Sequence, residues 1–241
     1  MKDSPTINYN RVIPSSSLDR FRWVEYQIKK CKVGKILDVG AGEMPFKNLA
    51  VKLGFDYRSH DFEKYSGNSE SPGLQNKDWL NSGHDLVCDI MEIPEDSYEL
   101  IIITEVLEHV PDPAAAMAKI SKLLAPDGKI LITVPFSSRM HQSPFWFSSG
   151  LSPFWFFHHA KLNELEVSDC ILLGNFYDVM IQEVKLFFGP MGYWKINLGE
   201  FTTYFLRKLR KILEPRISTA LLDSGSLAVF VLLQNDSSSA S

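Results

Sequence analysis

Residues 35–46, Lys-Ile-Leu-Asp-Val-Gly-Ala-Gly-Glu-Met-Pro-Phe, join a strand-length apolar run to a glycine turn and then to the start of a helix. Gly40 and Gly42 allow backbone angles that are closed to other residues, and they lack the Cβ atoms that would bar a ligand. The turn delivers such a ligand to a helix N-terminus, where unpaired backbone N–H groups favour a negative group such as a carboxylate. The segment therefore predicts a strand–turn–helix unit that binds a small molecule.

Short apolar runs alternate with helical stretches along the chain, which is typical of a parallel sheet with helical crossovers. Strands are expected at 35–39, 55–60, 85–88, 98–104, 129–134, about 167–173 and 227–233. Helices are expected at about 18–32, 46–53, 113–124, 178–188 and 201–213. The predicted fold class is α/β, with a Rossmann-like, doubly wound, mostly parallel seven-stranded sheet and helices on both faces.

Several residues mark where the predicted helices begin and end. The first helix has one apolar face, formed by Leu18, Phe21, Val24 and Ile28. Pro45 suits a first helical position and Gly54 the position just past a helix end. Asp112 can cap a helix that starts at Pro113, whose apolar face is Met117, Ile120 and Leu124.

Length and composition fit one large domain, since the chain has 241 residues of which 45% are hydrophobic. We expect a polar segment at 1–17, a single domain at 18–234 with an acceptor-binding insertion at about 137–163, and a disordered Ser-rich tail at 235–241. The net charge of −4 argues against a nucleic-acid partner. Three scattered cysteines and a polar N-terminus without a signal core predict a reducing, cytoplasmic location.

One acidic residue precedes the glycine turn, and two others stand at the ends of the next two predicted strands. Asp38 directly precedes the glycine turn, and Asp61 lies about 20 residues further on, where a carboxylate can accept hydrogen bonds from ribose hydroxyls. Asp89 ends the third strand, where it could accept from an adenine amino group. Pro45 takes the place of the third glycine of the dinucleotide fingerprint, so pyrophosphate packing is less well served. The series favours a nucleoside ligand other than a dinucleotide.

The segments KILDVGAG, Asp61, HDLVCDIMEIPEDSYELIIITEVLEHVPDP and LLAPDGKILITVPF together resemble the successive motifs of class I S-adenosylmethionine-dependent methyltransferases. The resemblance is strong over about 34–136. Further along, HQSPFWF, FWFFHH and GNFYDVMIQEV are similar, less specifically, to methyltransferases of surface-polysaccharide and sugar biosynthesis. The resemblance implies a small-molecule methyltransferase with S-adenosyl-L-methionine as its cofactor and a sugar or glycan hydroxyl as its acceptor.

The resemblance also implies a role for particular residues. Asp38, Gly40 and Gly42 would hold the methionine part of the cofactor, and Asp61 would hold the ribose. Asp89 and the backbone of Ile90 would hold the adenine. Thr104 and Glu105, at the end of the fourth strand, would line the open side of the cofactor. Pro45 departs from the commonest form of the glycine motif and leaves the shape of the turn open.

A hydroxyl acceptor must lose its proton near the transition state, and histidine or a carboxylate suits this task near neutral pH. Sites in open α/β sheets lie beyond the carboxyl ends of the strands, which selects Glu105, His109 and His141 as catalytic candidates. His141 is the leading base, and His109 the better candidate for positioning. Glu108, His109 and Asp112 lack a convincing metal-ligand pattern, so no metal site is predicted.

Two further segments have a functional and a structural interpretation. Residues 144–157 contain five Phe and two Trp, which suit either a lid over the acceptor or ordinary packing, including a dimer contact. The basic helix 201–213 places Phe201, Phe205, Leu209 and Ile212 on one stripe. It is a candidate for peripheral contact with an anionic membrane, although such charges more often form a solvated face. The oligomeric state stays open.

Two other functions fit parts of the sequence. An NAD(P)-dependent sugar-nucleotide reductase or epimerase often uses a Tyr-x-x-x-Lys pair, and Tyr26/Lys30 and Tyr204/Lys208 have this spacing. Neither pair lies where the predicted fold would place it. The other alternative is a non-catalytic module with a methyltransferase fold. The motifs retain their expected residues, so the sequence gives no support to this alternative. The acceptor also stays open, since a lipid, a quinone-like compound or an amine would fit.

Overall fold

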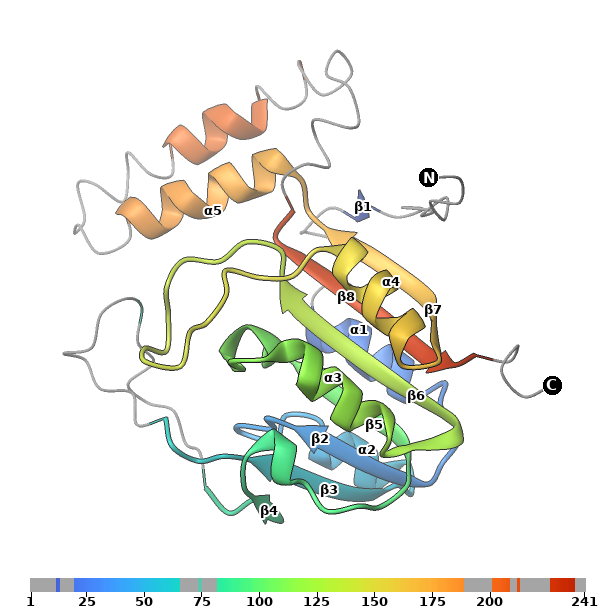
Figure 1. Ribbon diagram of the computed structural model, residues 1–241. Helices are drawn as coiled ribbons and strands as arrows, with labels where there is room; N and C mark the ends of the chain where they lie inside the picture. Colours follow the sequence, from blue (N-terminus) through green and yellow to red (C-terminus); the bar gives the residue numbers. More distant parts are fainter. Residues whose placement is uncertain are drawn as a thin grey trace. The chain divides into compact units, whose positions relative to one another are not determined.

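The computed structural model describes residues 12–13, 20–65, 74, 82–188, 201–208, 212 and 226–236 (Figure 1). The chain divides into two compact units. The larger unit consists of Asp19–Cys170 with Val229–Ser241, and the smaller consists of Met1–Leu18 with Ile171–Ala228. The predicted extent of a single domain, 18–234, stays a prediction beside this division.

One sheet contains all the strands of the described residues. Its order is β1 (Val12–Ile13), β7 (Leu165–Leu173), β8 (Ala228–Asn235), β6 (Leu124–Pro135), β5 (Tyr98–Thr104), β2 (Lys35–Val39), β3 (Asp56–Asp61) and β4 (Leu86–Val87). From β6 to β4 the neighbours are parallel. β7 and β8 are antiparallel, because Leu227 bonds to Leu173 whereas Asp236 bonds to Glu164. The predicted mostly parallel Rossmann-like sheet is confirmed, with the two-residue β1 as an eighth strand.

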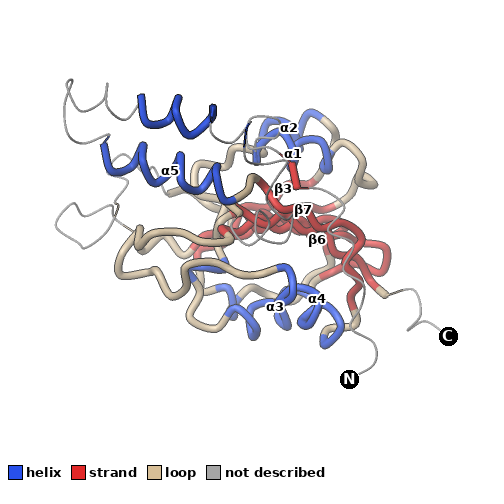
Figure 2. The backbone as a smooth tube through the Cα atoms, turned by 90° about the horizontal axis from the view of Figure 1, so that it is seen from above, coloured by secondary structure: helices blue, strands red, loops and turns tan. Residues whose placement is uncertain are grey.

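The central strands are buried because helices cover both faces of the sheet. Leu100, Ile101, Ile102 and Ile103 of β5 are fully buried, as their continuous apolar run predicts for a central parallel strand. Figure 2 shows α1 (Arg20–Ile28) and α2 (Lys47–Lys52) on one face and α3 (Pro113–Ser121) and α4 (Pro153–Leu162) on the other. The parallel order therefore brings the carboxyl ends of β2, β3, β5 and β6 to one edge.

The buried face of α1 contains Val24 and Ile28, as predicted, but it contains Trp23 and not Phe21. Trp23 is buried and packs on Phe230 of β8 with ring centroids 5.2 Å apart, whereas Phe21 is 40% exposed. Phe21 instead lies beside Phe46, 5.9 Å between centroids. The prediction that Phe21 faces the core was wrong, since the aromatic side chain of α1 that packs against the sheet is that of Trp23. Leu18 lies outside the described residues.

The observed ends of α2 and α3 agree in part with those predicted from their proline, glycine and aspartate residues. Pro45 lies in the turn before α2 rather than at its first position, and Phe46 is the N-cap. Gly54, with φ +89°, follows the helix as predicted. The Asp112 side chain caps α3 by accepting from the Ala115 amide. Leu124 was wrongly assigned to this helix: it begins β6, whose pairing with β5 shifts register between Tyr98 and Leu100.

The last strand is longer than predicted, and this shortens the tail. Asn235 belongs to β8 and bonds to the carbonyl groups of Ala125 and Pro126, and the Asp236 amide donates to Glu164. The prediction of disorder from residue 235 was therefore wrong for these two residues. Residues 237–241 lie outside the described part of the chain.

Two helical segments belong to the smaller unit. The helix α5 (Phe176–Phe188) begins two residues before the predicted start, because the Asn175 side chain accepts from the Tyr177 amide. Residues 201–208 are helical, and Phe201, Phe205 and Ile212 of the predicted apolar stripe are exposed, while Thr203 and Leu206 are buried. Leu209 lies outside the described residues, and contact of the stripe with a membrane stays a prediction. Within the described residues, no helix is long and apolar enough to span a bilayer.

The cap of α3 yields a stability prediction. Asp112→Ala removes the acceptor for the Ala115 amide, and loss of an N-cap acceptor costs about 0.5–2 kcal/mol. Urea unfolding should show a free energy of unfolding lower by that amount. Asp127→Ala, which removes an exposed aspartate of β6, is the matched control and should change stability by less than about 0.5 kcal/mol. Equal effects of the two substitutions would contradict the capping role.

Candidate active site

The glycine turn after β2 rests on the segment after β5. Gly40 and Gly42 have φ angles of +63° and +51°, which confirms that this turn uses backbone conformations suited to glycine. The Ala41 amide donates to the His60 carbonyl at 2.9 Å. A Cβ atom at Gly40 would lie 2.4 Å from Cγ2 of Val106. Glycine at position 40 therefore permits the close approach of the turn to the residues that follow β5.

Asp61, at the end of β3, lies directly against this turn. Its Oδ2 accepts from the Gly42 amide at 3.2 Å, and its Oδ1 accepts from the Glu63 amide at 3.0 Å. The residue is only 6% exposed. The structure thus brings Asp61 and the glycine turn together, as the predicted ribose site requires. Ribose binding itself stays a prediction.

His84 holds the other side of the turn, and sequence reasoning missed it. Its buried ring lies between the Gly42 carbonyl, 2.9 Å from Nε2, and the Glu63 carboxylate, 2.6 Å from Nδ1. Because a carbonyl oxygen only accepts, Nε2 must be the donor there. The hydrogen bond from His84 holds the pKa of Glu63 below its usual value. His84 therefore links the turn to the residues after β3.

Asp38 is buried beneath the turn, on the last-but-one position of β2. Its Oδ2 accepts from the Tyr57 hydroxyl at 2.5 Å, and the residue is 1% exposed. Burial raises the pKa of Asp38 to about 7, while the Tyr57 hydrogen bond and nearby His84 oppose the rise. Asp38 is thus a buried carboxylate next to the glycine turn, as predicted. Its direct contact with the cofactor stays a prediction.

Asp89 and Ile90 follow β4 and form the start of a short 3-10 helix, η1 (Ile90–Glu92). Asp89 is exposed, and its side chain accepts from the Met91 amide at 2.9 Å. The Asp89 amide in turn donates to Glu92, which completes a capping box. Asp89 therefore has a structural role at this position, and its predicted contact with adenine, together with that of the Ile90 backbone, stays untested.

Thr104 ends β5, and Glu105 follows it in a left-handed backbone conformation with φ +55°. The Glu105 carboxylate accepts from the Thr133 hydroxyl at 2.9 Å and forms an ion pair with Arg20 at 3.5 Å. These contacts fix Glu105 between β6 and α1. Its catalytic role stays a prediction.

Glu108, His109 and His141 meet beyond the ends of β5 and β6. One ligand-type atom from each lies within 4.8 Å of the others, and the two imidazole centroids are 4.7 Å apart. His109 Nδ1 contacts the Phe145 carbonyl at 2.6 Å, and His141 Nδ1 contacts the Arg139 carbonyl at 2.9 Å. The sequence identified His109 and His141 separately. The association of His141 with Glu108 and His109 is visible only in the fold.

Burial sets the protonation of this cluster. Glu108 is fully buried, and burial, followed by the charge of Glu105, raises its pKa well above the usual value. Burial also lowers the pKa of His109 to about 4, although its contact with the Phe145 carbonyl opposes the change. His109 is therefore a neutral imidazole at physiological pH.

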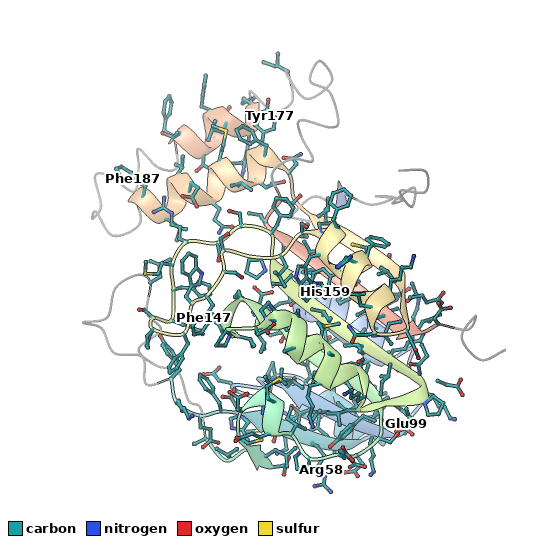
Figure 3. All side chains as sticks on the ribbon, viewed as in Figure 1. Arg58, Glu99, Phe147, His159, Tyr177 and Phe187 are labelled. Carbon is teal, nitrogen blue, oxygen red and sulfur yellow. The ribbon has the colours of Figure 1, made fainter. Side chains whose placement is uncertain are left out.

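The aromatic segment 144–157 has both packed and exposed members. Phe156 is fully buried, and Phe145 makes an edge contact with Phe62 at 4.9 Å between centroids. Phe147 and Phe154 are 50% and 60% exposed, and Figure 3 shows Phe147 on the loop between β6 and α4. The amides of Phe147 and Ser148 donate to the Glu108 carbonyl, so the segment lies against the histidine cluster. The lid interpretation stays a prediction.

The Tyr-x-x-x-Lys pairs have a structural explanation. Lys30 Nζ lies 4.1 Å from the ring centroid of Tyr26, and Lys208 Nζ lies 5.5 Å from that of Tyr204. Both tyrosines are exposed members of helices. Residues four apart are neighbours on a helix surface, so these are cation–π contacts rather than catalytic pairs.

Buried Asp38 yields a pH prediction for the ligand-free protein. The pKa is 3.8 for the ordinary group and about 7 in the fold, so between these values the unfolded chain binds fewer protons than the native chain. Stability contributed by Asp38 is therefore present at low pH and falls as pH rises from 3.8 to about 7, by at most about 1.4 kcal/mol per unit.

Asp38→Asn should remove this fall, as urea unfolding between pH 5 and 8 would show by difference from the unsubstituted chain. Asp56→Asn changes an exposed aspartate of β3 and should leave the pH dependence unchanged. Parallel pH curves for the unsubstituted chain and Asp38→Asn would contradict the assignment.

Comparisons with known proteins agree with this geometry. A family model described as a methyltransferase domain matches residues 18–171, which is more than half of the chain. The chain is 29% identical over 133 residues to a ubiquinone biosynthesis O-methyltransferase of Psychrobacter cryohalolentis, covering 47% of this chain and 51% of that protein. It is 30% identical over 105 residues to the enzyme of that name from Aeromonas salmonicida, covering 41% and 42%. The chain thus matches about half the length of these curated relatives or less.

Solved structures share the fold at low sequence identity. A putative sarcosine dimethylglycine methyltransferase from Galdieria sulphuraria superposes with a TM-score of 0.52 at 17% identity, covering 89% of this chain and 84% of that one. A SAM-dependent methyltransferase from Archaeoglobus fulgidus gives 0.52 at 12% identity, covering 89% and 94%. The family match favours S-adenosylmethionine over a nicotinamide cofactor. The chain therefore belongs to the methyltransferase-domain family, as a class I protein whose cofactor is S-adenosylmethionine.

Proposed function

We propose that this chain transfers a methyl group from S-adenosylmethionine to a hydroxyl oxygen of a small-molecule acceptor. The observation that carries the proposal is the close approach of Gly40 to Val106. It joins the turn expected to hold the cofactor to the segment that bears Glu105, Glu108 and His109. A methyl donor on the turn would thus lie next to side chains suited to an acceptor hydroxyl.

The residues present fit the cofactor's chemistry. The turn after β2 has the left-handed backbone that a ligand-cradling glycine loop requires, and carboxylates stand at the ends of β2 and β3. Asp38 and the glycine turn would hold the methionine part, and Asp61 the ribose hydroxyls. Asp89 and the Ile90 backbone would receive the adenine, with Thr104 on the open side. When bound, the cofactor supplies a methyl group on a positively charged sulfur.

The transfer needs alignment more than activation by the protein. The acceptor oxygen forms a bond to the methyl carbon as the carbon–sulfur bond breaks, and the electron pair of that bond stays on sulfur. The hydroxyl proton leaves the acceptor oxygen, and the imidazoles of His109 and His141 are the nearest candidates to receive it. Alignment of two bound reactants alone can supply about 7–11 kcal/mol.

The acceptor we favour is a phenolic hydroxyl on a small aromatic ring. The named relatives are O-methyltransferases of ubiquinone biosynthesis, although this chain matches only part of each. The backbone of Phe145 contacts His109 and that of Phe147 contacts Glu108, and the side chains of these residues are of a kind that suits such a ring. A sugar hydroxyl is the second candidate, since aromatic faces also suit sugar rings.

A labelled-methyl assay tests the reaction. The chain is incubated with S-adenosylmethionine carrying a labelled methyl group and with either a catechol-type acceptor or a sugar nucleotide, and the products are identified by mass. We expect label in a methyl ether of the catechol. Label found only in the sugar would show that the acceptor is a sugar hydroxyl, the second candidate. The absence of transfer to any hydroxyl compound in a fractionated cell extract, despite cofactor binding, would contradict the proposed function.

Asp61 yields a prediction for cofactor affinity. Asp61→Ala removes a carboxylate that holds the turn and is expected to hold the ribose, and hydrogen bonds to charged groups contribute about 1.5–3 kcal/mol. Titration calorimetry with S-adenosylhomocysteine should therefore show an affinity about 10–100-fold weaker. Asp56→Ala, on the exposed side of the same strand, should bind as the unsubstituted chain does. An unchanged affinity in Asp61→Ala would remove Asp61 from the site.

A further inference from the structure

Three potential metal-binding side chains converge beyond the carboxyl ends of β5 and β6. Glu108 and His109 belong to the short helix η2 (Leu107–His109), and His141 lies on the loop after β6. One donor atom of each lies within 4.8 Å of the others, and His109 Nε2 is 3.8 Å from Glu108 Oε1. Loops far apart in sequence thus bring one carboxylate and two imidazoles to a common point.

The hydrogen bonds of the two imidazoles fix which nitrogen is available. In both His109 and His141, Nδ1 lies within hydrogen-bond distance of a backbone carbonyl. A carbonyl oxygen only accepts, so Nδ1 carries a proton in each ring, and in a neutral imidazole Nε2 then has the lone pair. Metal-binding histidines almost always donate their second N–H in this way, which orients the ring and fixes its tautomer.

The carboxylate of Glu108 lacks the partners that its burial demands. The side chain is fully buried, and neither oxygen has a hydrogen-bond partner among the described residues. A buried carboxylate is costly unless it is paired or coordinates a metal. Arg20 does not supply a direct pair, because its guanidinium contacts Glu105 instead.

We propose that Glu108, His109 and His141 bind one divalent cation of the Zn²⁺ or Mn²⁺ type. Two imidazoles and a carboxylate are a ligand set of catalytic zinc and non-haem iron sites, which keep at least one position open. Donors about 2.0–2.2 Å from one ion lie within about 4.4 Å of each other. The observed spread of 4.8 Å therefore has to close by only a few tenths of an ångström. The earlier expectation of no metal site is replaced by this proposal.

The cation gives the proposed function a means of activating its acceptor, and this part of the inference rests on that function. The open position takes the acceptor hydroxyl oxygen, whose pKa a bound divalent cation lowers, as it does for water. Because both imidazoles then bind the cation, the hydroxyl proton passes to solvent instead of to His109 or His141. The oxygen forms its bond to the methyl carbon, and the carbon–sulfur electron pair stays on sulfur. An acceptor with two adjacent hydroxyl groups, such as a catechol, would fit an ion with two open positions.

Metal binding can be measured without any acceptor. The full chain, freed of metal by chelation, is loaded with Zn²⁺, desalted and analysed for bound metal, and Co²⁺ loading gives an absorption spectrum that reports its ligands. We expect one Zn²⁺ per chain and a Co²⁺ spectrum of a four- or five-coordinate site. His141→Ala should weaken Zn²⁺ binding at least about 100-fold, since even loss of an outer hydrogen-bond partner costs 10–100-fold.

Control variants separate this site from adventitious binding. His158→Ala removes an exposed histidine of α4 outside the cluster and should bind Zn²⁺ as the unsubstituted chain does. Glu108→Gln keeps the buried shape while removing the charge, and should lose Zn²⁺ as His141→Ala does. Circular dichroism verifies the fold of each variant. Zn²⁺ retained equally by folded His141→Ala and Glu108→Gln, or no Zn²⁺ on the unsubstituted chain, would overturn the proposal. Zn²⁺ bound at the cluster without methyl transfer would instead count against the proposed function alone.

Discussion

The site is organised around one residue, Gly42, whose backbone is held from two sides. Gly42 donates its amide hydrogen to Asp61, the last residue of β3, and accepts at its carbonyl from His84, which lies between β3 and β4. A buried turn in a left-handed conformation leaves its backbone groups without helix or sheet partners, so side chains must provide them. The parallel pairing of β2 with β3, and of β3 with β4, brings those side chains to the turn. The shape of the cofactor loop thus depends on the sheet.

The strands with continuous apolar runs, the glycine turn and the helix start at Asp112 were predictable from sequence. The continuous apolar run of β5 and the glycine turn after β2 are local signals, and each matched its residues closely. Asp112 followed by Pro113 likewise predicts the start of α3, because Asp before Pro is a strong signal for a helix N-terminus. The failures were tertiary choices. In the structure Trp23, and not Phe21, is the aromatic residue of α1 that is buried against β8. Leu124 does not belong to the helix α3 but pairs with Tyr98 of β5.

The site was predictable residue by residue but not as an arrangement. His84 contacts Gly42 from 42 positions away, and nothing in its neighbourhood in the sequence marks it. The same limit applies to Glu108. Sequence reasoning grouped it with Asp112, whose carboxylate is in fact occupied by the Ala115 amide. The partner that the fold provides is His141, on the loop after a different strand, β6.

The two carboxylates after β5 show how neighbouring residues acquire different chemistry. Glu105 is partly exposed and has an arginine and a hydroxyl as partners, so its charge is balanced within the described structure. Glu108, three residues on, is sealed from water and has neither. A proton would neutralise Glu108, but the resulting O–H would still need an acceptor, and His109 Nε2 at 3.8 Å is beyond hydrogen-bond distance. A cation instead uses the lone pairs of all three side chains at once, and it leaves no donor unsatisfied.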